Sequence, residues 1–188
     1  MNNTALIIVD MVYDFTNPLG KVYYPKTEEI IPSILELLSA CRKNNCLIVF
    51  MQHRYRENKF DTNLLNMRPC CIEGSGGEEI DERFHVNKDT EYIIPKRRYS
   101  SFFGTDLDLV LRENKIKQII VAGTKTNNCI NATVLDANYL DYDTYVVKEC
   151  VATSDDQTNE IYLRDMGKYL CNVISLESAL GRLELGEL

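Results

Sequence analysis

Residues 4–10 read TALIIVD, five apolar residues between a threonine and an aspartate. An apolar run without polar alternation is typical of a strand buried on both faces of a parallel sheet. The apolar residues of Thr27–Lys43 recur every three or four positions, which predicts an amphipathic helix. Cys46–Met51 reads CLIVFM and predicts a second buried strand. Strand, helix and strand in this order predict two parallel strands joined by a right-handed crossover.

The rest of the chain continues this alternation. Further strands and helices are predicted at 91–95, 106–114, 118–122, 128–140, 143–148, 159–169, 172–175 and 176–183. The pattern predicts a Rossmann-like, three-layer α/β/α fold around a mainly parallel sheet of about six strands. Because no repeat or linker divides the 188 residues, we expect a single domain over residues 1–188. The irregular segment His53–Lys88 interrupts the alternation, and long loops at one end of a sheet usually carry function.

The composition excludes two classes of partner. The chain has 21 basic and 28 acidic residues, and this net charge of -7 is unfavourable for binding the phosphates of nucleic acids. No apolar run approaches the ~20 residues that span a bilayer. The first residues, MNNT, lack the positive charge that begins a signal peptide. We therefore expect a cytoplasmic protein that contacts neither nucleic acid nor membrane.

The cysteines and histidines narrow the chemistry. Seven cysteines, an odd number, in a chain without a secretion signal argue against a disulfide framework. The two histidines, His53 and His85, lie outside any metal-binding motif, so we expect no metal centre. The sequence contains no G-x-S-x-G motif, and the glycines of 74–77 and 123–126 lack the spacing of nucleotide-binding loops. No cofactor is therefore expected.

Three ionisable residues follow predicted strands, at the edge where parallel sheets bind their ligands. Asp10 follows the first strand, Lys96 the third and Cys129 the fourth. A cysteine at the start of a helix and beside a lysine is expected to have a lowered pKa. With a carboxylate to move the proton, the three residues supply a nucleophile, an electrostatic partner and an acid/base. Each also has a structural interpretation, as a core thiol, a surface charge or a helix cap.

Four segments of the chain match a known family pattern. They are ALIIVDMVYDF (5–15), CIEGSGGEEI (71–80), KRRYSSFFGTDL (96–107) and GTKTNNCINATVLDA (123–137). Together they resemble the isochorismatase-like cysteine hydrolase superfamily, whose branches include nicotinamidases, N-carbamoylsarcosine amidases and isochorismatases. The resemblance extends from residue 5 to residue 137 and implies the fold of that superfamily.

The resemblance also implies roles for individual residues. It implies that Cys129 is the nucleophile, that Asp10 is the general acid/base, and that Lys96 orients and activates the thiolate. It implies an oxyanion hole made by the backbone N–H groups of Lys125 and Cys129, and a cis peptide bond between Thr124 and Lys125. The family usually forms homo-oligomers, so we expect one here.

Further residues are candidates for the substrate pocket. Phe15 is expected as a pocket wall and its neighbour Asp14 as a structural residue. Arg54 is a candidate for holding a substrate carboxylate, with a solvated charged loop as the alternative. The remaining pocket candidates are His53, Tyr99 and Phe102. The segment 56–88 is either a lid or part of a partner's pocket.

Two departures from the family pattern bear on the substrate. Val12 and Tyr13 replace the Gln-Asn of many members, which changes the edge of the pocket. The stretch 51–56, MQHRYR, lacks the aspartate and the second histidine of the metal site in nicotinamidases. A metal-dependent nicotinamidase is therefore not expected, and His53 is interpreted as a hydrogen-bonding loop residue.

These observations predict a cysteine hydrolase. The expected reaction cleaves a C–N bond of a small amide or an N-carbamoyl (ureido) compound through a thioester on Cys129. One alternative is isochorismatase-type hydrolysis of a vinyl ether, which does not need the cysteine as a nucleophile. The other is a non-catalytic scaffold that has kept the fold.

Overall fold

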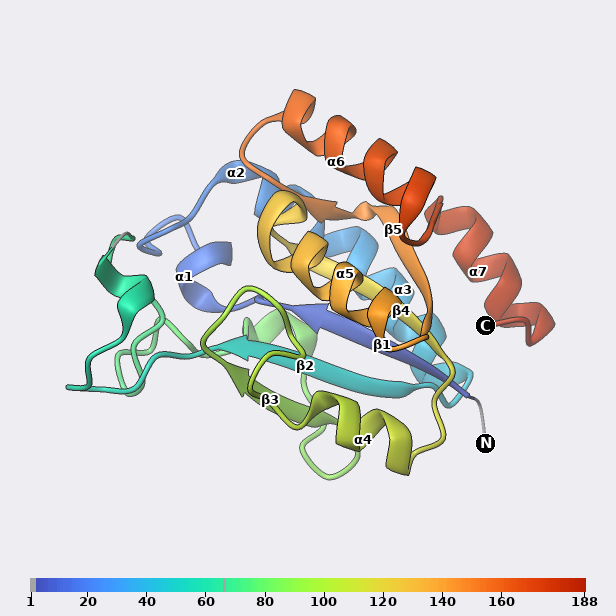
Figure 1. Ribbon diagram of the computed structural model, residues 1–188, viewed down its shortest axis with the longest axis horizontal. Helices are drawn as coiled ribbons and strands as arrows, with labels where there is room; N and C mark the ends of the chain where they lie inside the picture. Colours follow the sequence, from blue (N-terminus) through green and yellow to red (C-terminus); the bar gives the residue numbers. More distant parts are fainter. Residues whose placement is uncertain (1–2, 66) are drawn as a thin grey trace.

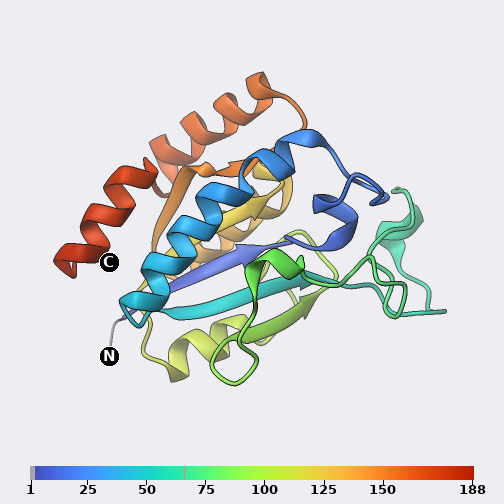
Figure 2. The ribbon, with the colours of Figure 1, turned by 180° about the vertical axis from the view of Figure 1, so that it is seen from behind.

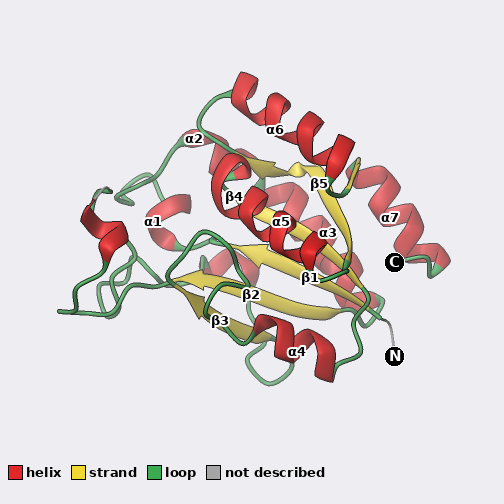
Figure 3. Ribbon diagram, in the orientation of Figure 1, coloured by secondary structure: helices red, strands yellow, loops and turns green. Residues whose placement is uncertain are grey.

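The computed structural model describes residues 3–65 and 67–188. At its centre is a sheet in the order β3-β2-β1-β4-β5-β6, and every neighbouring pair of strands is parallel. The strands are β1 (Thr4–Val9), β2 (Leu47–His53), β3 (Tyr92–Lys96), β4 (Gln118–Thr124), β5 (Asp143–Ala152) and β6 (Asn172–Ile174). The predicted six-stranded sheet is confirmed, and Figure 3 shows it between layers of helices.

Helices cover both faces of this sheet (Figures 1 and 2). The α-helices are α1 (Tyr13–Thr16), α2 (Pro25–Glu29), α3 (Ile31–Lys43), α4 (Leu107–Glu113), α5 (Asn131–Tyr139), α6 (Asp156–Tyr169) and α7 (Leu176–Leu185). The shorter helical turns are η1 (Thr62–Leu65), η2 (Glu82–Phe84) and the π-helix η3 (Thr126–Ile130). Helices α3 and α7 pack on one face, and α4, α5 and α6 on the other. No helix in residues 3–65 and 67–188 is long and apolar enough to cross a membrane.

The central strand β1 contributes to two hydrophobic cores. All of its residues are buried. Leu6 and Ile8 belong to the core under α3 and α7. Ala5, Ile7 and Val9 belong to the core under α4, α5 and α6. Because successive strand residues point to opposite faces, filling both cores requires the continuous apolar run of this segment.

The first predicted helix is divided into two. Helix α2 ends at Glu29, and α3 begins at Ile31. Pro32 lies at the start of α3, where its missing N–H would be unpaired in any case. Within one longer helix it would remove a hydrogen bond and clash with the preceding turn. The prediction of a single helix from Thr27 to Lys43 is therefore wrong in its first turn.

Asp14 ties together the loops at the carboxyl edge of the sheet. Its Oδ2 accepts a hydrogen bond from the backbone N–H of Cys71 at 2.6 Å, and its Oδ1 accepts one from that of Lys21 at 3.1 Å. Gly77 packs so closely that a Cβ there would lie 2.4 Å from Oδ2 of Asp14. Asp14 thus has the structural role predicted for it, and it fixes the loops that surround the site.

Candidate active site

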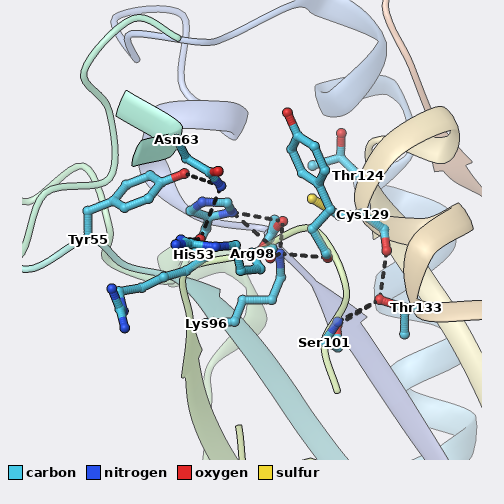
Figure 4. A network of polar contacts seen from close by, with 12 residues as sticks. His53, Tyr55, Asn63, Lys96, Arg98, Ser101, Thr124, Cys129 and Thr133 are labelled. Atoms are coloured by element: carbon cyan, nitrogen blue, oxygen red, sulfur yellow. Dashed lines mark hydrogen bonds and ion pairs between the residues drawn. The ribbon is translucent and has the colours of Figure 1, made fainter. Parts of the chain in front are cut away.

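Four neighbouring strands each bring one chemically active residue to the same edge of the sheet. Lys96 ends β3, His53 ends β2, Asp10 follows β1, and Cys129 lies in η3 after β4. Because the strand order is β3-β2-β1-β4, the four side chains meet although they are far apart in the sequence. At most 4% of any of these residues is exposed. Figure 4 shows His53, Lys96 and Cys129 around this common point.

Lys96 forms the central ion pair of the cluster. Its Nζ lies 2.8 Å from Oδ2 of Asp10. The same Nζ donates to the carbonyl oxygens of Arg98 and Tyr99, at 2.9 and 3.1 Å. An ammonium group has three protons, and these three acceptors use all of them. The ammonium group is therefore held in one orientation, with its charge beside Asp10.

His53 is the second neighbour of Asp10. Its Nδ1 lies 3.4 Å from Oδ2 of Asp10 and 3.4 Å from Nζ of Lys96. Because the protons of Lys96 are already used, we assign the imidazole proton to Nδ1, which donates weakly to Asp10. Among the described residues, Nε2 of His53 and Oδ1 of Asp10 have no hydrogen-bond partner. The site thus contains two buried acceptor atoms that are free.

Burial and neighbouring charges set the protonation states. Burial raises the pKa of Asp10, but Lys96 and His53 outweigh it, so this pKa lies below its usual value. Burial lowers the pKa of Lys96, but Asp10 and Cys129 outweigh it and raise this pKa. Burial and then Lys96 lower the pKa of His53. Near neutral pH the cluster therefore holds an Asp10–Lys96 ion pair and a neutral imidazole.

The thiol of Cys129 is protonated in the unliganded site. Burial and the neighbouring Asp10 raise the pKa of Cys129 to about 12, although Lys96 acts in the opposite direction. The lowered pKa expected from the sequence is therefore wrong for the free protein. The sequence pattern indicated the lysine and the helix start, but it gave no measure of the burial that outweighs them.

Local structure places Cys129 beside the ion pair. At Gly123, φ is +116°, and a Cβ would lie 2.1 Å from the carbonyl oxygen of Val9, so only glycine allows β4 to approach β1 here. The peptide bond between Thr124 and Lys125 is cis. The carbonyl oxygen of Cys129 accepts a hydrogen bond from Oγ1 of Thr133 at 2.6 Å, which ties the π-helical turn to α5.

A cavity opens above the thiol. Its volume is about 80 Å³. Its lining residues are Phe15, Val22, His53, Met67, Tyr99, Lys125, Asn128 and Cys129. Of the predicted pocket residues, Phe15, His53 and Tyr99 therefore lie at the cavity.

Two other predicted pocket residues lie elsewhere. Arg54 pairs with Glu73 at 3.5 Å and lines a separate surface hollow. The reason is strand geometry, because adjacent residues at the end of β2 point to opposite sides and His53 takes the side of the cavity. Phe102 stacks on Tyr142, with ring centroids 5.8 Å apart, and packs against the core under α4 and α5. The prediction that Arg54 and Phe102 line the pocket is therefore wrong.

Four further side chains among the described residues line the cavity without having been predicted to do so. Lys125 was predicted only for its backbone N–H, and Asn128 was not predicted, although both flank Cys129 within one helical turn. That spacing was a usable signal. Val22 and Met67 come from irregular loops, whose positions depend on tertiary contacts such as those of Asp14. No sequence pattern indicates these two residues.

The family model described as "Isochorismatase domain" matches residues 4–178. The chain belongs to the isochorismatase family. This agrees with the residue segments quoted above, and it makes the protein an isochorismatase-family hydrolase.

Several known proteins are similar to this isochorismatase-family hydrolase. The uncharacterized isochorismatase family protein YaaI of Bacillus subtilis is 30% identical, over 94% of this chain and 95% of that protein. The maleamate amidohydrolase of Pseudomonas putida is 26% identical, over 95% of this chain and 86% of that protein. The crystal structure of a cysteine hydrolase from Pseudomonas syringae pv. phaseolicola superposes with a TM-score of 0.92 at 26% identity, over 98% of this chain and 93% of that chain. The three-layer fold is thus shared along nearly the whole chain.

Proposed function

We propose that this hydrolase cleaves the C–N bond of a small amide or N-carbamoyl (ureido) compound, with Cys129 as the nucleophile. The observation that carries the proposal is the buried ion pair of Lys96 and Asp10 beside the Cys129 thiol, at a cavity. A buried ion pair is a poor way to stabilise a fold, because removing both charges from water costs several kcal/mol per ion. A chemical role accounts for its presence here.

The first half-reaction forms a thioester. Sγ of Cys129 attacks the carbonyl carbon while Asp10 accepts the thiol proton, so a C–S bond forms and the carbonyl electrons move onto oxygen. We place the backbone N–H groups of Lys125 and Cys129 as the donors that bind this oxyanion. Asp10 then gives the proton to the leaving nitrogen, the C–N bond breaks, and ammonia or an amine departs.

The second half-reaction releases the acid. Asp10 accepts a proton from water as the oxygen adds to the thioester carbon. The C–S bond then breaks, and the sulfur recovers its proton from Asp10. The ammonium group of Lys96 stays charged throughout and stabilises the negative charge as it moves between carboxylate and sulfur. The free Oδ1 of Asp10 is the atom that suits it for both proton transfers.

The cavity limits the size of the reacting group. Its 80 Å³ is smaller than an engineered apolar cavity of about 150 Å³ that binds benzene. An amide or ureido head therefore fits beside Cys129, whereas an aromatic ring would have to remain at the mouth. Lys125 and Asn128 line the cavity and offer a cation and an amide to a polar tail. These features favour small aliphatic amides and N-carbamoyl acids over aromatic carboxamides.

The comparisons support the general reaction class. One similar protein is named a maleamate amidohydrolase, and one similar structure is named a cysteine hydrolase. Neither name gives the substrate of this chain. Hydrolysis of a vinyl ether and a purely structural role stay as outcomes of the test.

The test is ammonia release from a panel of N-carbamoyl amino acids, ureidoacrylate, biuret, small aliphatic amides and nicotinamide. Wild type, Cys129→Ala and the matched control Cys171→Ala are compared with a chelator present. We expect release by wild type and Cys171→Ala but not by Cys129→Ala, together with a rapid-quench mass increase on the peptide that contains Cys129. Release that survives Cys129→Ala would refute the nucleophile. No release from any compound would refute amide hydrolysis.

A further inference from the structure

Asp10, His53 and Cys129 bring three metal-ligating atoms to one point. A carboxylate oxygen, an imidazole nitrogen and the thiol sulfur all lie within 4.8 Å of one another, and all three residues are buried. The residues come from the ends of β1 and β2 and from η3. Their spacing in the sequence matches no metal motif, which is why the sequence predicts no metal centre. Only the strand order brings them together.

The donor set is that of Zn²⁺ and similar cations. Thiolate, imidazole and carboxylate bind Zn²⁺ at about 2.3, 2.0–2.1 and 2.0–2.2 Å. A tetrahedral ion with these bonds holds its ligand atoms roughly 3.3–3.6 Å apart. Nδ1 of His53 and Oδ2 of Asp10, at 3.4 Å, already have this separation, and no ligand atom lies more than 4.8 Å from another. His53 and Cys129 also line the cavity, which leaves a fourth position for water.

Two of the three residues carry atoms without partners. Within the described part of the chain, Oδ1 of Asp10 and Nε2 of His53 make no hydrogen bond, although the residues are 0% and 1% exposed. Buried polar atoms are rarely left in this state. A neutral imidazole can move its proton from Nδ1 to Nε2, so either nitrogen is available as a ligand. A cation here would give the unpaired carboxylate oxygen of Asp10 a partner. His53 would lose only its weak 3.4 Å hydrogen bond to Asp10.

Lys96 opposes the binding of a cation. Its ammonium group lies 2.8 Å from Oδ2 of Asp10 and 3.4 Å from Nδ1 of His53. In the free site the charges of Asp10 and Lys96 balance. Once the thiol of Cys129 loses its proton to the forming sulfur–metal bond, two negative ligands face the single positive charge of Lys96, which favours the bound divalent ion. The balance indicates reversible binding rather than a permanently held cofactor.

We propose that Asp10, His53 and Cys129 bind one Zn²⁺-class cation, and that this ion inhibits the enzyme. As the sulfur–metal bond forms, the thiol proton passes to solvent, and no group is oxidised or reduced. The ion occupies the sulfur lone pair that would attack the carbonyl and the carboxylate that would move the proton. Binding does not depend on the proposed function, whereas inhibition rests on it.

The first test measures binding of Cd²⁺ or Zn²⁺ alone to the full chain, by calorimetry and by the ultraviolet absorbance of the cadmium–thiolate bond. We expect one ion per chain, and protection of Cys129 from alkylation in the wild-type protein. Cys129→Ala should lose the absorbance. Loss of a residue that only orients a metal ligand lowers metal affinity about 10–100-fold. His53→Phe removes a ligand itself and should therefore lower the affinity by more than this. The matched controls His85→Asn and Cys171→Ala should bind as wild type.

The second test uses the opposing charge. Lys96→Gln removes the positive charge but keeps a donor, so it should bind Cd²⁺ at least about tenfold more tightly while losing activity. Wild-type binding without protection of Cys129, or unchanged affinity in both His53→Phe and Lys96→Gln, would overturn the proposal. If binding holds but no amide is hydrolysed, only the proposed function fails. If Cys129-dependent hydrolysis is found and Zn²⁺ neither binds nor inhibits, only this inference fails.

Discussion

Two buried carboxylates, Asp10 and Asp61, pair with consecutive basic residues at the end of β3, Asp10 with Lys96 and Asp61 with Arg97 and Arg98. They differ in how many of their oxygens are hydrogen-bonded. Oδ2 of Asp61 accepts from Arg97 at 2.9 Å, and Oδ1 accepts from Arg98 at 2.9 Å and from the backbone N–H of Asn63 at 3.0 Å. Oδ2 of Asp10 meets Lys96 at 2.8 Å. Oδ1 of Asp10 has no partner among the described residues.

The difference lies in the free oxygen and not in the charge. The pKa of Asp61 lies below its usual value, because the backbone N–H of Asn63 and the two arginines outweigh burial. The pKa of Asp10 is lowered as well. Asp61, whose oxygens are all occupied, can only fasten the loop to the end of β3. Asp10 keeps one oxygen for a proton or a ligand, which is the property that a catalytic carboxylate needs.

The largest expected effect separates the two carboxylates in catalysis. Asp10→Asn should lower kcat/KM by roughly 10²–10⁴, because a general acid/base contributes that much. Asp61→Asn should leave kcat/KM nearly unchanged. Steady-state kinetics on the preferred substrate of the panel measure both. An equal loss of kcat/KM in the two variants would mean that Asp61 also affects the reaction. The free oxygen would then not be what makes Asp10 catalytic.

The same two variants should also differ in the free energy of unfolding, but by less than they differ in activity. Asp10→Asn leaves the buried charge of Lys96 without a partner and should cost about 3–5 kcal/mol in the free energy of unfolding. Asp61→Asn should cost about 1–2 kcal/mol, because water can hydrate the half-exposed Arg97 and Arg98. Urea unfolding measures both values.

A double variant sharpens this second prediction. Asp10→Asn with Lys96→Met removes both buried charges, so it should recover most of the lost stability while kcat/KM stays at least as low as in Asp10→Asn. Additive losses in the double variant would show that the two residues do not compensate each other in the folded protein.

Much of the fold was accessible from the sequence for a clear physical reason. The continuous apolar run of Thr4–Val9 can only fill two cores, so the parallel sheet and its covering layers follow from it. Asp10, Lys96 and Cys129 were identified because each follows a strand whose carboxyl end lies at one edge. Pro32 also indicated the break between α2 and α3, but the apolar periodicity continues across it and favoured a single helix.

What the sequence did not indicate depends on tertiary geometry. The position of His53 between Asp10 and Lys96 requires β2 to lie between β1 and β3, and that order is not specified by any one segment. Arg54 was a candidate for the pocket because it follows the second strand, whose end borders the site, and can hold a carboxylate, but strand alternation turns its side chain to a separate surface hollow. The raised pKa of Cys129 depends on burial, which local sequence does not specify.

The reactivity of Cys129 provides a third test of the comparison. Its pKa of about 12 means that alkylation by iodoacetamide at pH 8 should be slower in the folded protein than in the unfolded chain, and should rise until the pH approaches 12. Asp10 raises this pKa, so Asp10→Asn should speed alkylation although it lowers kcat/KM. Lys96 lowers it, so Lys96→Gln should slow alkylation.

Asp61→Asn is the control for this measurement, which follows the mass of the peptide containing Cys129. Burial, Asp10 and Lys96 are the main causes of the shifted pKa of Cys129. Asp61 is bound by Arg97 and Arg98 instead, so the rate should change little. Slower alkylation in Asp10→Asn would contradict the assignment of Asp10 as the neighbour that holds the thiol protonated.

The smallest expected effect applies the same comparison, between a free and a paired charged group, to the cations Lys125 and Arg54. Arg54 is paired with Glu73 at 3.5 Å, whereas Lys125 lies at the cavity with its Nζ 5.0 Å from the ring centre of Tyr24 and, in the described chain, with no carboxylate partner. Lys125→Met should raise KM about tenfold for a substrate with a carboxylate, the equivalent of about 1.4 kcal/mol, and should leave KM for a neutral amide unchanged. Arg54→Ala should change neither. An equal rise for both substrates would mean that Lys125 acts by shaping the cavity, and the distinction between free and occupied charges would then hold only for the carboxylates.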